Sequence, residues 1–186
     1  MISVTGISKI HRRVIPFTLT MRMISLTTAP SLAAVLDLHP EVATAATTVT
    51  TVEQRFTERD FLAATNAARI ANGVPPLVLN AELSTAAAQK VLDMKKNNYW
   101  DHFRPSDHKA PWDFMKEAGY DYKVAGENLA RGFNSVQAIT DAWMASPAHR
   151  ANLLSDKYTD IGFADLEVND ANGNPVLLTV QMFGSR

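Results

Sequence analysis

The sequence predicts an α+β fold in which helices come first and strands follow. Apolar residues repeat at helical spacing through most of residues 57–154. Two apolar runs over residues 159–183 are separated by a cluster of turn-forming residues, which is typical of an antiparallel hairpin. Early helices followed by a late antiparallel sheet are characteristic of this class, and no internal repeat, glycine-rich phosphate loop or heptad run indicates another one.

Two helices are expected in the first half of the folded region. Thr57 provides a capping hydroxyl three residues before Asp60, and a helix should run from there to residue 71, where Asn72-Gly73 ends it. Asn80 should cap a second helix that ends near residues 97–98. The apolar stripe of this second helix consists of Leu83, Ala87, Val91 and Met94.

Shorter elements follow. Helices are predicted over residues 112–118, residues 135–146 and residues 147–154, and the last begins at Pro147 with Ser146 as its cap. Strands are predicted over three further ranges, namely residues 124–131, 159–168 and 176–183. The turn-rich residues 169–174 should join the last two strands as a hairpin.

Composition excludes several classes of function. The 186 residues include 18 Lys and Arg against 19 Asp and Glu, and the basic residues are scattered, so a nucleic-acid partner is not expected. The chain has no Cys, which excludes disulfides, zinc fingers, iron–sulfur clusters and thiol nucleophiles. Any metal ion must therefore be held by His and carboxylate side chains.

Residues 1–45 differ from the rest and predict a secretory signal peptide. The N-terminal part is basic, and an uncharged run of fourteen residues covers positions 23–36, within the usual signal-core length of about 7–15 residues. Ala43-Thr44-Ala45 follows as a small-x-small cleavage site. The alternatives are an uncleaved N-terminal anchor in contact with the membrane and a disordered leader. Residues 46–55 read as a linker, and residues 56–186 as the folded domain.

Three residues are the main candidates for chemistry. His102 follows the second predicted helix, Glu127 lies in an otherwise apolar strand, and His149 occupies the third position of the last short helix. A His at a helix N-terminus stays neutral more readily, which suits metal binding or proton acceptance. The separations of these residues match no local ligand motif. Each residue also has a structural interpretation, as a hydrogen-bonded core His or as a Glu paired with Arg131 or Arg150.

At these residues the sequence resembles the CAP superfamily, which groups cysteine-rich secretory proteins, antigen 5 and pathogenesis-related 1 proteins. The resemblance is to its Cys-free bacterial branch of SCP-domain proteins and covers about residues 56–183. The motifs that carry it are Asn66-x-x-Arg69, His102, Gly126-Glu127-Asn128-Leu129-Ala130, Trp143-Met144-x-Ser146-Pro147-x-His149-Arg150-x-Asn152-Leu153-Leu154 and Ile161-Gly162.

The resemblance implies an α-β-α sandwich with a central three-stranded antiparallel sheet between helical layers. It also implies a cleft with two His and two Glu that binds zinc in some members. His102, Glu127 and His149 match three of these positions and are the expected zinc ligands. Ser146 stands where the family has its second Glu, and Asn128 completes the cleft set. The exchange of a carboxylate for a hydroxyl removes one negative charge from the expected site.

Three functions are consistent with these features. The first is a secreted or cell-surface binding module whose cleft accepts a lipid, a peptide or a cell-envelope component. The second is a metal-dependent, peptidase-like hydrolase in which zinc activates water in the same cleft. The third is a structural surface protein without a small ligand. No catalytic residue can be named from the sequence, because it shows no Ser-His-Asp arrangement and no base beyond the ligands.

Overall fold

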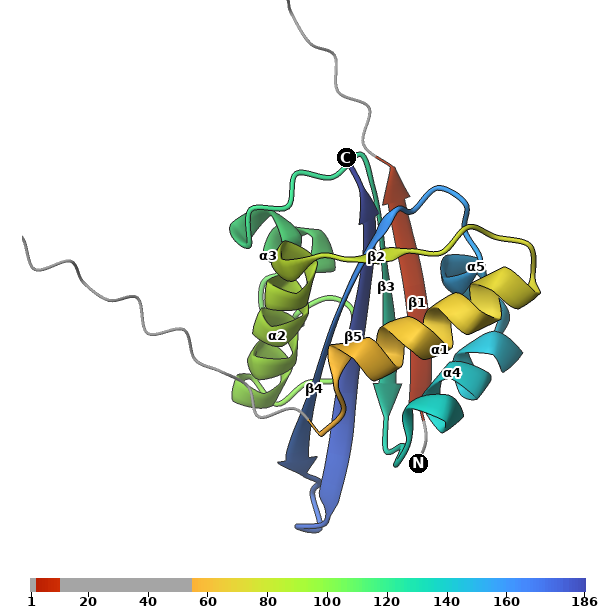
Figure 1. Ribbon diagram of the computed structural model, residues 1–186. Coiled ribbons are helices and arrows are strands. Elements are labelled where there is room, and N and C mark those ends of the chain that lie inside the picture. Colours follow the sequence, from red (N-terminus) through yellow and green to blue (C-terminus); the bar gives the residue numbers. More distant parts are fainter. Residues whose placement is uncertain (1–2, 11–54) are drawn as a thin grey trace, which may run out of the picture. The chain divides into compact units, whose positions relative to one another are not determined.

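The computed structural model describes residues 3–10 and 55–186 (Figure 1). Residues 46–54 of the predicted linker and most of the predicted leader lie outside these residues. Five helices and five strands are described, in the order β1 (Ser3–Ile10), α1 (Glu58–Ala71), β2 (Val78–Leu79), α2 (Ala81–Lys96), α3 (Pro111–Glu117), β3 (Val124–Arg131), α4 (Val136–Ala145), α5 (Pro147–Leu153), β4 (Asp160–Asn169) and β5 (Pro175–Ser185).

The two long helices begin where their capping residues predict. Thr57 accepts a hydrogen bond from the Asp60 amide at 3.2 Å, and Asn80 accepts one from the Leu83 amide at 3.0 Å. Each cap satisfies one of the amides that a helix N-terminus leaves without an internal partner. The expected α+β class and the predicted boundaries of all five helices are confirmed to within one or two residues.

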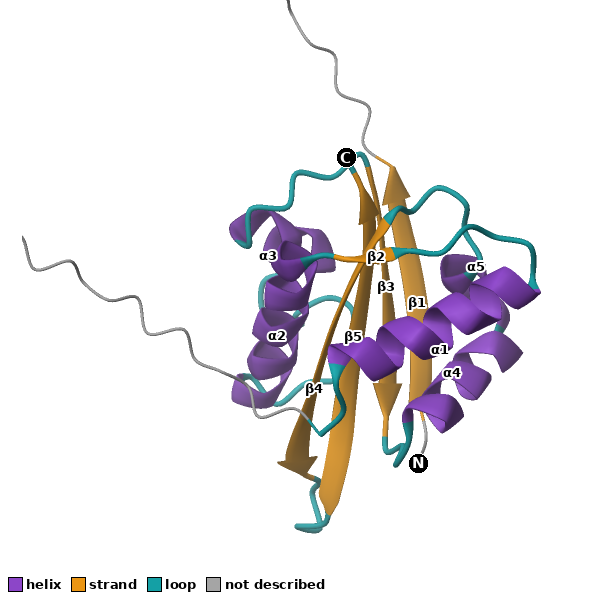
Figure 2. Ribbon diagram, in the orientation of Figure 1, coloured by secondary structure: helices purple, strands orange, loops and turns teal. Residues whose placement is uncertain are grey.

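The sheet is larger than the expected three strands. Its order is β1-β3-β5-β4-β2 (Figure 2). β3, β5 and β4 are antiparallel and correspond to the predicted strands. β2 adds a fourth strand by pairing in parallel with β4 at Asp160 and Ile161. Two residues are too few to show an alternating pattern, so β2 could not be recognised in the sequence.

β1 is a fifth strand and comes from the predicted leader. It pairs antiparallel with β3 along its whole length, from Ser3 opposite Arg131 to Ile10 opposite Val124. The remainder of the leader, residues 1–2 and 11–45, lies outside the described residues, so the expected role of the leader as a signal peptide or anchor stays a prediction. Among the helices that the structure describes, none is long and apolar enough to cross a membrane.

The sheet separates two buried clusters of side chains. Figure 1 shows α2 and α3 on one side of it and α1, α4 and α5 on the other. Alternate residues of β3 face the two sides: Ala125 and Leu129 belong to the α2 cluster, and Ala130 to the α4 cluster. Consequently Glu127 faces the α2 side, whereas its neighbour Asn128 faces the α4 and α5 side. This alternation gives each side of β3 its own buried polar group.

Candidate functional site

The site is built around a buried His–Glu pair. Glu127 lies in the middle of β3, and His102 lies in the loop that follows α2. His102 Nδ1 and Glu127 Oε1 are 2.5 Å apart, and the two side chains are 8% and 0% exposed. A carboxylate with so little access to water requires a hydrogen-bond partner, and His102 supplies it. The alternative pairing of Glu127 with Arg131 or Arg150 is not observed.

A third residue, Lys90 of α2, holds the loop that carries His102. Its buried ammonium group donates to the Tyr99 hydroxyl at 3.1 Å, to the Asp101 carbonyl at 3.0 Å and to the His102 carbonyl at 2.6 Å. Burial lowers the pKa of Lys90, although the negative charge of Glu127 acts in the opposite direction. Lys90 is therefore a positioning residue for His102.

Lys90 was missed by the sequence analysis, although the sequence contained a signal for it. It lies three residues after Ala87 and four before Met94, on the apolar stripe of its helix. A Lys on such a stripe is either misplaced or holds a buried acceptor. In this structure it holds three acceptors, and that number explains why full burial is tolerated.

Each side chain of the His–Glu pair has a second polar atom that does not take part in the contact between them. Among the described residues, neither His102 Nε2 nor Glu127 Oε2 has a hydrogen-bond partner, and both atoms are shielded from solvent. Buried polar atoms are nearly always paired in native proteins, so a buried pair with two such atoms calls for an explanation. A ligand that reaches these atoms would form its hydrogen bonds in a low-dielectric environment, where they are strong.

The other two cleft candidates, Ser146 and His149, interact with each other. Ser146 is the N-cap residue of α5, but its side chain makes no capping hydrogen bond to the helix backbone, contrary to the prediction. Its hydroxyl lies 2.7 Å from His149 Nδ1 instead. His149 is buried, and its carbonyl accepts a hydrogen bond from the Asn128 side chain at 3.4 Å. His149 thus contacts β3 through the Asn128 side chain, which lies on the opposite face of the strand from Glu127.

These positions give the zinc expectation no geometric support. Within the described ranges 3–10 and 55–186, no group of three or more His, Asp or Glu side chains is placed so that it could hold a metal ion. His102 Nδ1 and Glu127 Oε1 are engaged with each other, whereas a zinc site needs several such atoms free and converging on one point. Zinc binding by His102, Glu127 and His149 stays a prediction.

Asn128 belongs to a buried relay of neutral polar groups on the face of the sheet that α1 and α5 cover. Its amide donates to Gln181 Oε1 at 2.9 Å, and Gln181 donates to Thr65 of α1 at 3.1 Å. At the other end of the Asn128 side chain, Asn152 of α5 donates to Asn128 Oδ1 at 2.9 Å. The Tyr158 hydroxyl donates to Asn152 at 3.4 Å. The relay ties α1, β5, β3 and α5 together.

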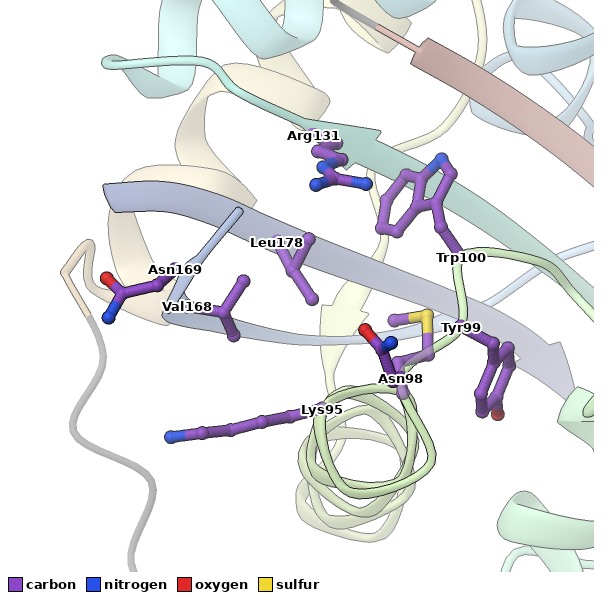
Figure 3. A pocket seen from close by; sticks show the side chains of 9 residues that line it. Lys95, Asn98, Tyr99, Trp100, Arg131, Val168, Asn169 and Leu178 are labelled. Carbon is purple, nitrogen blue, oxygen red and sulfur yellow. The ribbon is translucent and has the colours of Figure 1, made fainter. Parts of the chain in front are cut away.

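A pocket of about 360 Å³ is lined by residues of α2, β3, β4 and β5 and of the loop that carries His102 (Figure 3). Arg131, four residues from Glu127 along the strand, and Trp100, two residues before His102, are part of its wall. Trp100 and Tyr99 therefore line a pocket, while Phe103 is 40% exposed. The lining contains two basic residues and no acidic one: Met94, Lys95, Asn98, Tyr99, Trp100, Arg131, Val168, Asn169 and Leu178.

Comparison with known proteins identifies relatives of this domain. The chain is similar to YkwD of Bacillus subtilis strain 168, with 41% identity over 59% of this chain and 42% of YkwD. It is also similar to the membrane protein YlbC of the same organism, with 31% identity over 59% of this chain and 31% of YlbC. The chain thus spans less than half the length of either relative.

Solved structures share the fold. An extracellular SCP-domain protein from Bacillus anthracis matches with a TM-score of 0.59 and 27% identity, over 69% of this chain and 40% of that one. An outer surface protein of Borrelia burgdorferi matches in fold with a TM-score of 0.58 and 18% identity, over 73% of this chain and 99% of that one. The model of the CAP family, described as the cysteine-rich secretory protein family, matches residues 62–183. The chain therefore belongs to the CAP family.

Proposed function

We propose that this protein is an extracellular binding module whose cleft is centred on the His102–Glu127 pair. The ligand would be a lipid, a peptide or another cell-envelope component. The observation that carries the proposal is the pair of shielded atoms, His102 Nε2 and Glu127 Oε2, which have no partner among the described residues. The carboxylate oxygen accepts hydrogen bonds, and so does Nε2 of a neutral ring whose Nδ1–H faces Glu127, so together they suit a ligand that offers hydrogen-bond donors.

Binding rather than catalysis is favoured by the chemistry of the second acid position. Ser146 occupies that position, and its hydroxyl interacts with His149. A serine hydroxyl is a far weaker proton acceptor than a carboxylate, so it is a poor general base for activating water. The pocket that the His102 loop helps to line adds aromatic and aliphatic contact surface, which a binding site requires and which bond cleavage by itself does not.

The extracellular location is part of the same proposal. It is supported by the fold shared with an extracellular protein and an outer surface protein, and by the signal-like features of residues 1–45. Expression in a Bacillus host, followed by mass spectrometry of the protein in the medium and at the cell surface, tests it. We expect a species that begins near Ala46. Full-length protein retained in the cytoplasm would contradict the location.

A binding panel tests the cleft. The probes are phosphatidylglycerol vesicles, muropeptides released from peptidoglycan and extended synthetic peptides, measured by calorimetry against the full chain. We expect one class to bind and Glu127→Gln to weaken it at least tenfold. The matched control is Glu167→Gln, because Glu167 is an exposed carboxylate in the same sheet. Equal affinity of wild type and Glu127→Gln for every bound probe would contradict the proposal.

A zinc titration tests the alternative, a metal-dependent hydrolase. It uses the full chain beside His102→Ala and His149→Ala. Saturable one-to-one binding that is lost in both variants would establish the predicted metal site. Hydrolysis of a peptide probe that is abolished by a chelator and by Glu127→Gln would then favour the hydrolase. Absence of zinc binding by a folded wild type would leave the hydrolase without its metal.

A further inference from the structure

The outer edge of β3 is occupied by a strand from a remote part of the sequence. β1 runs antiparallel to β3, and each of its eight residues has a partner there (Figure 1). Residues 11–54 separate β1 from the next described residue in the chain, and the CAP match begins only at residue 62. The strand that completes this side of the sheet therefore comes from outside the family domain.

Contacts beyond the main-chain ladder hold β1 in place next to the candidate site. Ile7 lies directly opposite Glu127 and packs against the buried cluster on the α2 side. The side-chain amide of Asn152 donates to the Ile7 carbonyl at 3.3 Å and to the Glu127 carbonyl at 3.1 Å. One amide from α5 thus bridges the occupying strand and the strand that it covers, at the level of the His–Glu pair.

Without β1, this edge of β3 would carry backbone amides and carbonyls that have lost their strand partner. An exposed strand edge can acquire partners from another extended segment. β1 lies within the predicted leader, so export with cleavage near residue 45 would separate it covalently from the domain. The edge of β3 would then be available to another strand.

We propose that the β3 edge is a strand-addition site for an extended peptide, and that β1 is its intramolecular occupant. This inference rests on the proposed function and names peptide as the ligand class. In this mode the backbone ladder supplies most of the affinity and alternate side chains supply selectivity. The position opposite Glu127 is filled by Ile7, so an aliphatic side chain is preferred there. The side-chain amide of Asn152 donates a hydrogen bond to the main-chain carbonyl at the same position.

The experiment releases β1 from the β3 edge in the full chain and then adds a peptide that can pair with the same edge. Ile7→Pro removes both a backbone amide and the anchoring side chain, and so should release β1. A synthetic peptide with the sequence of residues 3–10 is then titrated by calorimetry into Ile7→Pro, wild type and Thr48→Pro, a control outside β1. We expect binding to Ile7→Pro at least tenfold tighter than to wild type or Thr48→Pro, because both retain an occupied edge.

Single N-methylation of the peptide amides distinguishes strand pairing from other contacts. In an antiparallel ladder, only every second residue directs its amide toward the partner strand. We therefore expect N-methylation to abolish binding at alternate positions and to leave it nearly unchanged between them. Uniform effects at all positions, or no binding to folded Ile7→Pro, would overturn the proposal.

Hydrogen exchange on the wild type provides a second measurement that does not depend on a variant that folds. If β1 is a removable occupant, its amides should exchange through an opening that leaves β5 protected. Exchange of β1 and β5 together, only on global unfolding, would overturn the proposal.

The binding panel separates the two proposals. Peptide binding to Ile7→Pro that is insensitive to an added Glu127→Gln would overturn the cleft alone. Glu127-dependent vesicle or muropeptide binding, together with no peptide binding to folded Ile7→Pro, would overturn the strand-addition site alone.

Discussion

The two faces of β3 carry buried polar groups of opposite character. On the α2 face, Glu127 is paired with His102 at 2.5 Å, and both side chains keep an outer atom without a partner among the described residues. On the α5 face, Asn128 joins Gln181 and Asn152 in a relay of neutral groups at 2.9 Å each. Adjacent residues of one strand thus take part in a charged, incompletely satisfied pair and in a neutral, connected network.

This difference separates a stabilising role from a binding role. A connected neutral network gains its hydrogen bonds without the desolvation cost of a charge, so it stabilises the fold. A buried carboxylate with one engaged oxygen loses hydration that its single partner does not fully replace. Such a pair is poorly suited to stabilise the fold, and a ligand would complete it. The comparison therefore predicts unequal losses of stability on substitution at the two faces.

The largest loss of stability should follow substitution in the relay. Asn128→Ala leaves Gln181 Oε1 without its donor and removes an acceptor from Asn152. Each unsatisfied buried group costs about 1–3 kcal/mol, so we expect the free energy of unfolding to fall by roughly 2–4 kcal/mol. Urea denaturation followed by circular dichroism measures it. Asn172→Ala, in the exposed turn between β4 and β5, is the control. An equal loss of stability there would contradict the stabilising role of the relay.

Local chemistry explains what the sequence could predict. Capping residues such as Thr57 and Asn80 act on amides three residues away, so the helix boundaries could be predicted from the sequence. His102 and Glu127 are 25 positions apart, and only the family resemblance placed them in one cleft, since no spacing rule relates them. Their direct hydrogen bond was not predicted. The link from Gln181 to Thr65 spans 116 positions and had no sequence signal. The strand β1 was missed, because the basic residues and the cleavage-site pattern favoured a leader.

A smaller loss is expected for Lys90→Met. The side-chain length is nearly kept, but the Asp101 and His102 carbonyls lose a donor. Relief of the desolvation that lowers the Lys90 pKa offsets part of this loss, so we expect about 1–3 kcal/mol. Faster hydrogen exchange in residues 99–103 should accompany it. Lys95→Met, an exposed position of the same helix, is the control. Unchanged exchange in Lys90→Met would contradict the positioning role.

Still smaller changes in the free energy of unfolding are expected on acidification, and Asp93 and Asp165 should contribute changes of opposite sign. Burial tends to raise the pKa of Asp93, but hydrogen bonds from Arg104 and Tyr99 hold it below its usual 3.8. Its stabilisation is present above that usual value and is lost as pH falls through the lowered pKa. Burial raises the pKa of Asp165 despite two main-chain amide donors. The folded state then binds this proton more tightly than the unfolded state, so stability rises as pH falls through the raised pKa.

Urea denaturation between pH 7 and pH 3 checks these signs, with Asp93→Asn and Asp165→Asn beside the wild type. Asp165→Asn should remove a gain in stability on acidification, and Asp93→Asn should remove a loss at the lowest pH. Each difference should be at most about 1 kcal/mol, because opposing influences act on each carboxyl group and partly cancel. Changes of the same sign in the two variants would contradict the assignment.

The unfolding free energy of Glu127→Gln tests the central claim most directly. The substitution preserves shape and an acceptor for His102 Nδ1, while it removes a buried charge whose second oxygen has no partner among the described residues. We predict a change within about 1 kcal/mol of wild type, in either direction, when it is measured beside Asn128→Ala in the same urea titration. A loss as large as that of Asn128→Ala would show that the pair on the α2 face stabilises the fold in the way the relay does, and would contradict its assignment as the binding site.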